Sequence, residues 1–407
     1  MAMGSGDPSK PPKVAIIGAG LTGLLVAHGL QKNGFDVAVF DRDAGLDARR
    51  RDWTIVLHWA MPTMARLLPD EVVRALPGAI TNRFLAFDDH AESLPCYNGV
   101  TGELLFKSPL PGSRRVSRQR LRRVLSRGVD VQWGKALAGI EVGDDDQEDA
   151  PVRLTFADGS AHEADFVLGA DGASSGVREY LVGAEAARIR GSGFMFATCI
   201  VKYNDADKVD AVVKAHPVAA ITLGSNAGAG CGIMYVDDPD DKASWTTFWV
   251  KFWPGAPVNL DGQDALSYLR DNTRGLCEPF QSLIDWTPDG STCYVDEMKY
   301  WVPVPYDNRG GRVTLAGDAV HPMLIYRGQG FQHAITDANN YVDALIKARD
   351  AKGDAKVRRE AVAAYDAEMV ERGANAVNQS VQEAKHSIDL ETLGKMLMVN
   401  KGHGRSA

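Results

Sequence analysis

Two glycine-rich segments near opposite ends of the 407-residue chain constrain the fold most strongly. The first, Gly18-Ala19-Gly20-Leu21-Thr22-Gly23, follows the apolar run Lys13–Ile17 and precedes residues of helical periodicity. The second lies within Val313–Asp337, where the apolar run VTLA ends in Gly317-Asp318 and two more glycines precede another helical pattern. Many nucleotide-binding folds bind phosphate and ribose with a strand, glycines, an acidic residue and a helix arranged in this way. Two such half-sites so far apart in sequence predict one long ligand, which suggests a dinucleotide.

The N-terminal segment has the glycine spacing of a dinucleotide-binding turn, and each glycine has a physical role. Gly18 permits the tight turn, Gly20 lets the backbone approach a pyrophosphate, and Gly23 allows the helix to pack closely on the strand. Asp41 ends a second predicted strand, 21 residues after Gly20. A carboxylate at that place can accept hydrogen bonds from a ribose diol. The segment therefore predicts a βαβ unit, which alone does not distinguish FAD from NAD.

Four further segments occur in an order and spacing that match one enzyme family: Val116–Leu121, Ala170–Arg178, Ala316–Pro322 and Gly328–Ala334. Together with the N-terminal turn, they resemble the class A flavoprotein monooxygenases, the 4-hydroxybenzoate and salicylate hydroxylase-like aromatic hydroxylases. The resemblance covers roughly Lys13 to Leu345, and the chain looks most like fungal secondary-metabolism members. Gln332 stands where the family usually has asparagine, and Asp41 where glutamate is commoner. Both replacements keep the hydrogen-bonding chemistry.

The resemblance implies which residues hold FAD. Asp318 should contact the ribitol or pyrophosphate, and Arg118 the flavin phosphates. Gly330 and Gln332 should approach the isoalloxazine, whereas Asp171 should serve both FAD and NAD(P)H. The complete predicted cofactor-binding set is Gly18, Gly20, Gly23, Asp41, Arg42, Arg51, Arg118, Asp171, Asp318, Gly328, Gly330 and Gln332.

The same resemblance implies a monooxygenase. NADPH or NADH would bind transiently and reduce FAD, and molecular oxygen would then give a flavin C4a-hydroperoxide. An aromatic, indole or polyketide-type small molecule would take up one oxygen atom, by hydroxylation, epoxidation with rearrangement or oxidative decarboxylation. The helix that starts near Phe331 would direct its positive N-terminus at the reduced, anionic flavin. This chemistry needs no protein-bound metal and no nucleophilic triad, and the sequence predicts neither.

Substrate-facing residues are harder to predict. The aromatic-rich runs between Phe194 and Trp253 should cover the flavin. Tyr235 lies on one of these runs and is the candidate for orienting or deprotonating a substrate, although a core tyrosine is the slightly favoured alternative. His321 is expected to be structural, and His58, like Asp52, carries only a weak functional expectation.

The predicted fold class is α/β (α+β), with a Rossmann-like FAD-binding domain, an inserted β-sheet substrate domain and a C-terminal helical segment. The predicted divisions are a disordered tail (1–12), three FAD-binding parts (13–82, 111–190 and 301–347), substrate-domain hairpins (83–110), a β-rich substrate domain (191–300) and C-terminal helices (348–407). The glycines of AGAGCG, residues 227–232, are expected to form a flexible hairpin rather than a second phosphate loop.

Composition narrows the function further. A net charge of −8 and a pI near 5.6 argue against a nucleic-acid partner. No apolar run reaches the roughly 18 residues of a membrane span, and the N-terminus has no signal-peptide core, so the cytoplasm is the default location. Five cysteines without a CxxC pattern predict neither a metal site nor a disulfide framework. The expected oligomeric state is a monomer or homodimer.

Two other functions remain open. One is a different flavoenzyme on the same fold, such as a halogenase or a saturase-type reductase. The run Trp249–Pro254 lacks the isoleucine and the spacing of a halogenase WxWxIP motif, which disfavours the halogenase. The other is a non-catalytic, flavin-bound regulator, against which the intact motifs on both halves of the FAD site argue.

Overall fold

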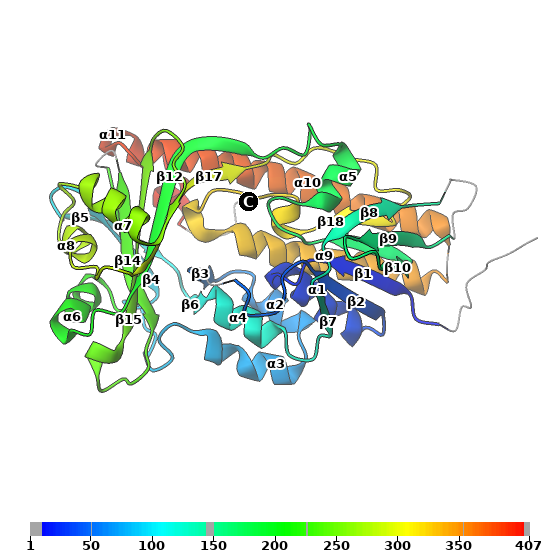
Figure 1. Ribbon diagram of the computed structural model, residues 1–407, viewed down its shortest axis with the longest axis horizontal. Helices are drawn as coiled ribbons and strands as arrows, with labels where there is room; N and C mark the ends of the chain where they lie inside the picture. The colour runs from blue at the N-terminus through cyan, green and yellow to red at the C-terminus, as the bar shows by residue number, and fades with distance from the viewer. Residues whose placement is uncertain (1–9, 50, 144–149, 225–226, 353, 403–407) are drawn as a thin grey trace, which may run out of the picture.

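The chain folds into two parts that lie side by side and are joined along one edge by a long helix (Figure 1). A computed structural model describes residues 10–49, 51–143, 150–224, 227–352 and 354–402. Most of the predicted tail, residues 1–9, lies outside these ranges. Helix α10 (Ala355–His386) contributes Ala361 and Val362 to the core of the first part, and Ala384 to a cluster with the second.

A five-stranded parallel sheet forms the centre of the first part. Its strand order is β18 (Val313–Leu315), β11 (Phe166–Gly169), β1 (Lys13–Ile17), β2 (Asp36–Asp41) and β7 (Val131–Trp133). The inner strands β1 and β11 and the edge strand β18 are almost continuously buried, as expected for a sheet covered on both faces. The βαβ unit predicted from the N-terminal glycines is confirmed, and so is the mixed α/β class.

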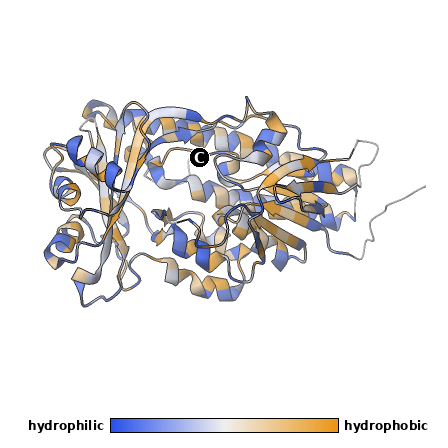
Figure 2. Cartoon of the chain, in the orientation of Figure 1, coloured by the Kyte–Doolittle hydropathy of each residue, from blue (hydrophilic) through white to orange (hydrophobic). Residues whose placement is uncertain are grey.

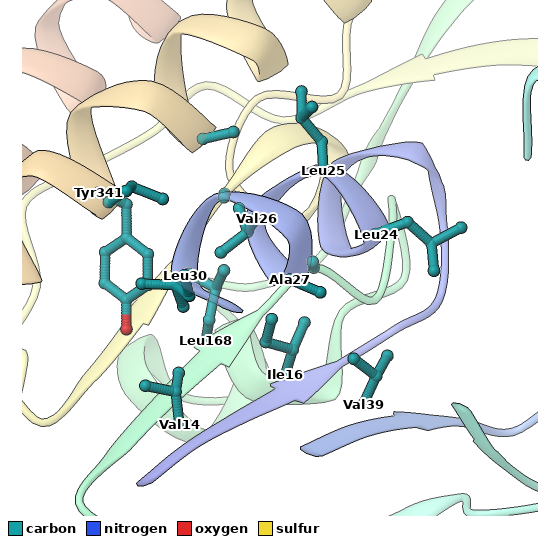
Figure 3. Packing of buried hydrophobic residues seen from close by; sticks show 14 of the residues in the cluster. Val14, Ile16, Leu24, Leu25, Val26, Ala27, Leu30, Val39, Leu168 and Tyr341 are labelled. Carbon is teal, nitrogen blue, oxygen red and sulfur yellow. The ribbon is translucent and has the colours of Figure 1, made fainter. Parts of the chain in front are cut away.

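Two helices cover one face of this sheet. Helix α1 (Leu21–Lys32) packs its apolar side chains against Ile16 and Leu168 of the sheet, and Tyr341 of α9 (Gly330–Asp350) lies close by (Figure 3). A Cβ on Gly29 would stand 2.9 Å from the side chains of both Leu67 and Val342. That glycine therefore lets α1, α9 and α2 (Met61–Leu67) pack at close range.

A second, three-stranded antiparallel sheet precedes β11 in the chain. Its middle strand β9 (Val152–Phe156) pairs with β8 (Leu137–Glu141) and with β10 (Ala161–Ala164), and the chain then enters β11 of the parallel sheet. Asp165 separates the two strands because its backbone N–H donates to Lys13 O and its carboxylate accepts the Lys13 N–H. These bonds start β11 alongside β1.

The second part is built on an eight-stranded mixed sheet, at the left in Figure 1. Its strand order is β16 (Leu260–Asp261), β17 (Thr292–Tyr300), β12 (Arg190–Val201), β15 (Thr246–Pro254), β14 (Gly228–Tyr235), β13 (Ala219–Leu223), β4 (Ser93–Asn98) and β5 (Leu104–Pro109). The predicted hairpin region 83–110 thus supplies the β4–β5 edge. Figure 2 shows hydrophobic residues concentrated along these strands.

Three helices, which were not predicted from the sequence, cover the outer face of that sheet. They are α6 (Ala206–Ala215), α7 (Gly262–Asp271) and α8 (Phe280–Asp285). Leu266 and Leu283 from these helices pack on Met195 and Cys199 of β12. Each helix is at most ten residues long, so its stability comes from this burial and its helical periodicity is weak in sequence.

The glycines of AGAGCG form a central strand, so the flexible hairpin expected there is wrong. Gly228, Gly230 and Gly232 lie on β14, between β13 and β15. A Cβ on Gly232 would stand 2.4 Å from Val218 O and 2.8 Å from the Phe248 ring. These positions are glycines because the neighbouring chain and large side chains already fill the space above them.

One disulfide also departs from the expectation. Cys199 on β12 and Cys293 on β17 face each other in register and are bonded, although the cysteine pattern predicted no disulfide framework. The expectation failed for this pair because cross-strand neighbours are invisible in sequence spacing. Cys96, Cys231 and Cys277 are free and buried.

The other helices and strands described include β3 (Thr54–Leu57), α3 (Asp70–Ala75), β6 (Arg114–Ser117), α4 (Arg118–Leu125), α5 (Gly176–Val182), α11 (Leu390–Leu393) and α12 (Leu397–Lys401). None of the helices in the described ranges is both long and apolar enough to cross a membrane. The described residues also contain no group of three or more His, Cys, Asp or Glu placed to hold a metal ion.

Replacing Gly232 should destabilise the second part. Gly232→Ala places a methyl group against Val218 O and the Phe248 ring, and such overpacking costs about 1–3 kcal/mol of unfolding free energy. Gly45→Ala is the control, because no atom of the described residues lies within 4 Å of its Cβ position. Urea denaturation of both variants measures the difference. Equal stability of the two variants would contradict the packing described for β14.

Candidate functional site

The N-terminal glycine turn is pressed against a second loop. Gly18 has φ +110 and donates its N–H to Phe40 O at 2.7 Å. A Cβ on Gly18 would stand 2.3 Å from Ala170 O, and one on Gly23 would stand 2.0 Å from Gly18 O. Around Gly20 the nearest atom would be 4.0 Å away. Gly18 and Gly23 therefore make the turn and its packing, while the backbone at Gly20 stays open to a ligand.

The C-terminal glycine segment meets the same place. Gly317 has φ +63, and a Cβ there would stand 2.5 Å from Thr22 Oγ1 of α1. Ala316 N–H donates to Gly169 O at 2.9 Å, and Ala170 N–H donates to Ile17 O at 2.8 Å. The carboxyl ends of β1, β11 and β18 thus converge, as they do at ligand sites of open α/β sheets.

Asp318 is the acidic group at this convergence. Its side chain is exposed, yet the surrounding protein raises its carboxyl pKa through desolvation. The neighbouring His321 and Arg118 side chains oppose that rise in the Asp318 pKa. A carboxylate that solvent can reach, and that is nevertheless partly desolvated by the protein around it, lies on the wall of a concave surface. Among the described residues no hydrogen bond reaches the Asp318 carboxylate, so its acceptor capacity is available to a ligand.

Arg118 begins helix α4 and faces the same region. Ser117 caps this helix by accepting the Arg120 N–H at 3.0 Å. The Arg118 guanidinium lies 4.6 Å from the centre of the Trp53 ring. Burial and the neighbouring Arg49 lower its pKa, while Asp318 acts in the opposite direction. Arg118 and Asp318 are thereby close enough to interact electrostatically, as the predicted FAD site requires.

Asp41, the predicted ribose ligand, also accepts hydrogen bonds within the protein. Its Oδ2 accepts the Ala19 N–H at 2.7 Å, and its Oδ1 accepts the Asp43 N–H at 2.9 Å. Arg122, which the sequence analysis missed, donates from Nε to Ala19 O at 2.8 Å and pairs with Asp41 at 3.4 Å. Asp41 and Arg122 together hold the glycine turn from behind. A ribose contact by Asp41 stays a prediction.

Asp171 holds the loop on which Gly18 rests. Its Oδ2 accepts the Gly176 N–H at 2.8 Å, at the start of α5. Its Oδ1 is buried without a hydrogen-bond partner in the described protein, and burial raises the carboxyl pKa. Arg178 of the same motif is buried and donates to three carbonyls, including Ala319 O at 2.9 Å. Arg178 therefore ties the Asp171 loop to the Asp318 loop.

The loop before α9 carries the remaining predicted glycines. Gly328 has φ +58 and is exposed, and Gly330 is the first residue of the helix, one residue earlier than predicted. The first turn contains no acidic residue, and no side chain of the described residues caps it, so its N–H groups and positive dipole end remain available. This is the end expected to face the reduced flavin.

The Gln332 side chain is fully buried. Its Oε1 accepts the N–H groups of His58 and Ala60 at 3.3 and 3.2 Å, and its Nε2 donates to Val56 O at 2.7 Å. The side chain therefore pins α9 to the strand β3 and the turn after it. The predicted approach of Gln332 to the isoalloxazine can only involve its backbone or a rearranged side chain.

A buried charge network supports the Asp318 loop. Asp337 accepts the Gly317 N–H at 2.8 Å and pairs with His321 Nε2 and Arg372 Nη2, each at 2.7 Å. Burial alone would raise the Asp337 pKa, but His321 and Arg372 outweigh it and lower the pKa. His321 is thus a structural group, as expected from the sequence.

The two remaining predicted arginines lie elsewhere. Arg51 forms an ion pair with Asp296 of β17 and lies 4.7 Å from the centre of the Tyr294 ring. It therefore bridges the two parts of the molecule. Arg42 is exposed. FAD contacts by either arginine stay predictions.

Tyr235 joins a polar cluster between the two parts. Its hydroxyl donates to the buried carboxylate of Asp52, which also accepts from Ser117 Oγ at 2.6 Å and Gln119 N at 3.0 Å. The Arg120 guanidinium lies 3.9 Å from the centre of the Tyr235 ring. Burial and the Asp52 carboxylate raise the phenol pKa. The phenol therefore keeps its proton at neutral pH. A substrate-orienting role for Tyr235 stays a prediction, and so does the alternative of a tyrosine that only packs and bonds at the junction.

The convergent residues fit an FAD molecule. The open backbone at Gly20 suits a pyrophosphate, and the accessible acceptor at Asp318 suits a ribitol hydroxyl. The uncapped start of α9 suits an electron-rich ring edge. The Oδ1 of Asp171 is a buried acceptor that none of the described residues satisfies.

Comparison with known families agrees with this site. A family model for FAD dependent oxidoreductases matches residues 13–76, which contain β1, α1 and β2. A model for an FAD binding domain matches residues 287–380, which contain the Asp318 loop and α9.

Two curated fungal proteins are similar over nearly the whole chain. An FAD-dependent monooxygenase (phnB) of Penicillium herquei is 32% identical over 96% of this chain and 94% of its own length. An FAD-dependent monooxygenase (cctM) of Talaromyces islandicus is 33% identical over 90% of this chain and 91% of its own length.

Solved structures share the fold at lower identity. Klebsiella pneumoniae HpxO complexed with FAD and uric acid has a TM-score of 0.72 at 20% identity, with 97% of this chain and 93% of that chain covered. The 2,6-dihydroxypyridine-3-hydroxylase of Arthrobacter nicotinovorans has a TM-score of 0.70 at 19% identity, with 93% of both chains covered.

Removing the Asp318 carboxylate should weaken FAD binding. A lost hydrogen bond to a charged acceptor costs roughly 1.5–3 kcal/mol, so Asp318→Ala should raise the dissociation constant for FAD about 10- to 100-fold. Titration of the apoprotein by flavin fluorescence measures the constant. Asp89→Ala, at an exposed carboxylate of the second part, should bind FAD like the parent protein. An unchanged constant in Asp318→Ala would remove Asp318 from the site.

Removing the Tyr235 hydroxyl should weaken the junction between the two parts. Tyr235→Phe deletes one hydrogen bond to the buried Asp52 and should lower the unfolding free energy by about 1–3 kcal/mol. Tyr300→Phe is the matched control, because no hydrogen bond of its half-buried hydroxyl is found among the described residues. Chemical denaturation compares the variants. If both lose the same stability, the Tyr235–Asp52 bond does not hold the junction.

Proposed function

The chain belongs to the FAD-dependent monooxygenases of the aromatic hydroxylase type, and we propose that it inserts one oxygen atom from O2 into an aromatic or indole-type small molecule. NADPH or NADH is the proposed electron donor. The proposal includes a role in secondary-metabolite biosynthesis, in the cytoplasm, as a monomer or homodimer. Family membership rests on relatives that are at least 32% identical and align with this chain over more than 90% of their length.

The convergence around Asp318 carries the proposal. Three strand ends and an open glycine turn converge beside the accessible, desolvated Asp318 carboxylate, and α9, whose first turn has no side-chain cap among the described residues, holds the same loop through Asp337. When bound there, FAD would supply the redox chemistry, with oxygen transfer through a flavin C4a-hydroperoxide. The protein supplies the binding groups, the positive end of α9 and a wall that excludes water.

The inner face of the large sheet supports an aromatic substrate. Phe252 on this face contacts Tyr326, in the loop before α9, with ring centres 5.6 Å apart. The same face presents half-buried Phe196, Ile200 and Val250 on β12 and β15. Such an apolar wall beside the glycine loop suits a flat ring system. Tyr235, with its proton held by Asp52, would orient a polar group of the substrate.

Isotope labelling tests the proposal directly. The holoenzyme, NADPH and ¹⁸O₂ are incubated with a panel of phenols and indoles, and products are analysed by mass spectrometry. A product that has gained one ¹⁸O atom, formed only with NADPH or NADH, is the expected result. A halogenated product, formed only when halide is added, would indicate the other flavoenzyme class. Flavin that NADPH and NADH never reduce, with or without ring ligands, would indicate a non-catalytic regulator.

A further inference from the structure

The C-terminal segment, Leu390–Gly402, folds back over the inner face of the large sheet. It contains α11 and α12, and α11 lies beside the end of α10 (Figure 1). Its buried Met396 and Met398 belong to one apolar cluster with Phe252 of β15 and Tyr326 of the loop before α9. Those two rings join the sheet to the glycine loop. The C-terminal segment therefore packs beside the proposed substrate site.

A strip of half-buried apolar residues borders this cluster on the inner face. It consists of Phe196, Ile200, Ile221 and Val250. Phe196 and Ile221 pack against the cluster that contains the C-terminal segment, whereas Ile200 and Val250 pack against a second buried cluster. The strip lies between the two clusters and is still partly open to solvent. It is therefore apolar surface that a ring system could cover.

A buried carboxylate holds the C-terminal segment in place. Glu383 of α10 is only 2% exposed. Its Oε1 accepts the Leu397 N–H at 2.7 Å, and its Oε2 accepts the Met398 N–H at 3.2 Å. These two N–H groups belong to the first turn of α12, which has only five residues and is too short to be stable alone. Glu383 therefore fixes where the methionines lie.

Arg327 ties the other end of the segment to the glycine loop. Its side chain is buried and donates to Gln379 Oε1 at 3.2 Å and to Gly402 O at 3.3 Å. Its backbone has φ +67, a costly conformation for a residue with a Cβ, and it immediately precedes Gly328. The C-terminal segment is thus bonded to the loop proposed to contact the flavin and packed on the sheet proposed to contact the substrate.

The side chains that the segment places there are adaptable. Met396 and Met398 are unbranched and have several rotatable bonds, and Met298 of β17 belongs to the same cluster. Methionine fills irregular space and can change its conformation to accommodate a neighbour, and its sulfur makes favourable contacts with aromatic rings. A wall built from methionines next to an apolar strip suits a flat ring, and its side chains determine how much room the ring has.

We propose that the C-terminal segment forms one wall of the substrate site, and that Met396 and Met398 limit the size of the ring system that this site accepts. The inference rests on the proposed monooxygenase function and adds residues that select its substrate. The ring lies on the strip Phe196, Ile200, Ile221 and Val250, with the methionines at its edge. Glu383 and Arg327 are positioning residues, which act through the segment.

The test measures ring size against affinity in the FAD-loaded enzyme. Phenol, 1-naphthol and 4-phenylphenol are titrated while the flavin absorbance is recorded. Met396→Ala and Met398→Ala each leave space beside the strip. In at least one of them, the dissociation constant of 1-naphthol relative to phenol should fall about 10-fold, as expected when roughly two more carbon groups are buried. Met396→Leu, which conserves volume, should keep the relative affinity of the parent enzyme.

Two matched controls separate a widened site from a loosened fold. Val399→Ala changes an exposed side chain of α12, and Met369→Ala removes a fully buried methionine from the face of α10 that packs on the FAD-binding part. Both should keep the relative affinities of the parent enzyme. If the parent binds no FAD and oxidises no NADPH, the proposed function itself has failed. If it does both, the titrations judge the C-terminal segment alone.

Hydrogen exchange of the parent enzyme tests the wall without a substitution. Saturation with the tightest-binding phenol should slow exchange of the Leu397 and Met398 amides, because a ring packed against the segment opposes its opening. Amides of α6, on the outer face of the sheet, should exchange at the same rate with and without the phenol. Bound phenol that leaves the Leu397 and Met398 amides unchanged would overturn the proposal.

The titrations have equally definite meanings. A fall in the relative constant in Met396→Ala or Met398→Ala, but in neither control, supports the wall. The proposal is overturned if the relative constant stays the same in both of these variants, or if it falls as far in Met369→Ala. It is also overturned if the FAD-loaded parent and all variants bind none of the three phenols, because the strip is then not a ring-binding surface.

Discussion

The close approach of the Gly18 turn to Ala170 O determines where everything else in the site can lie. A Cβ on Gly18 would be 2.3 Å from that carbonyl, so only glycine lets the ends of β1 and β11 meet. The contact of Gly317 with Thr22 adds the end of β18 in the same way. Because three strand ends are joined by backbone contacts, the groups they carry are positioned without long side chains. The result is a preorganised edge on which a pyrophosphate can rest.

The substrate half depends on that edge through a few polar links. Asp52 receives hydrogen bonds from Ser117, at the start of α4, and from Tyr235 on the large sheet. Removal of a donor from a buried carboxylate is costly, so these bonds fix how the sheet faces the FAD site. The contact of Phe252 with Tyr326 brings the apolar face beside the glycine loop. The apolar sheet face proposed to contact the substrate and the glycine loop proposed to contact the flavin therefore pack against each other directly.

Much of the FAD half could be predicted from sequence, because its determinants are local. The strand–turn–helix at Gly18–Gly23, the Ser117 cap and the helix after Gly328 all have short-range signals. Long-range partners could not be predicted in this way. The guanidinium of Arg122 reaches Ala19 O across 103 residues, and Gln332 reaches Val56 across 276. The helices on the outer sheet face were missed for the same reason, since tertiary burial, and not local periodicity, stabilises them.

The most direct test of the central claim is the absorbance spectrum of the purified protein and the FAD released on denaturation. One site formed by converging strand ends predicts a flavin spectrum and one FAD per chain, either as purified or after FAD is added to the apoprotein. A Gly20→Val variant, whose side chain would occupy the open space at the turn, should lose that FAD while keeping its fold. A colourless protein that gains no bound flavin when FAD is added would contradict the account.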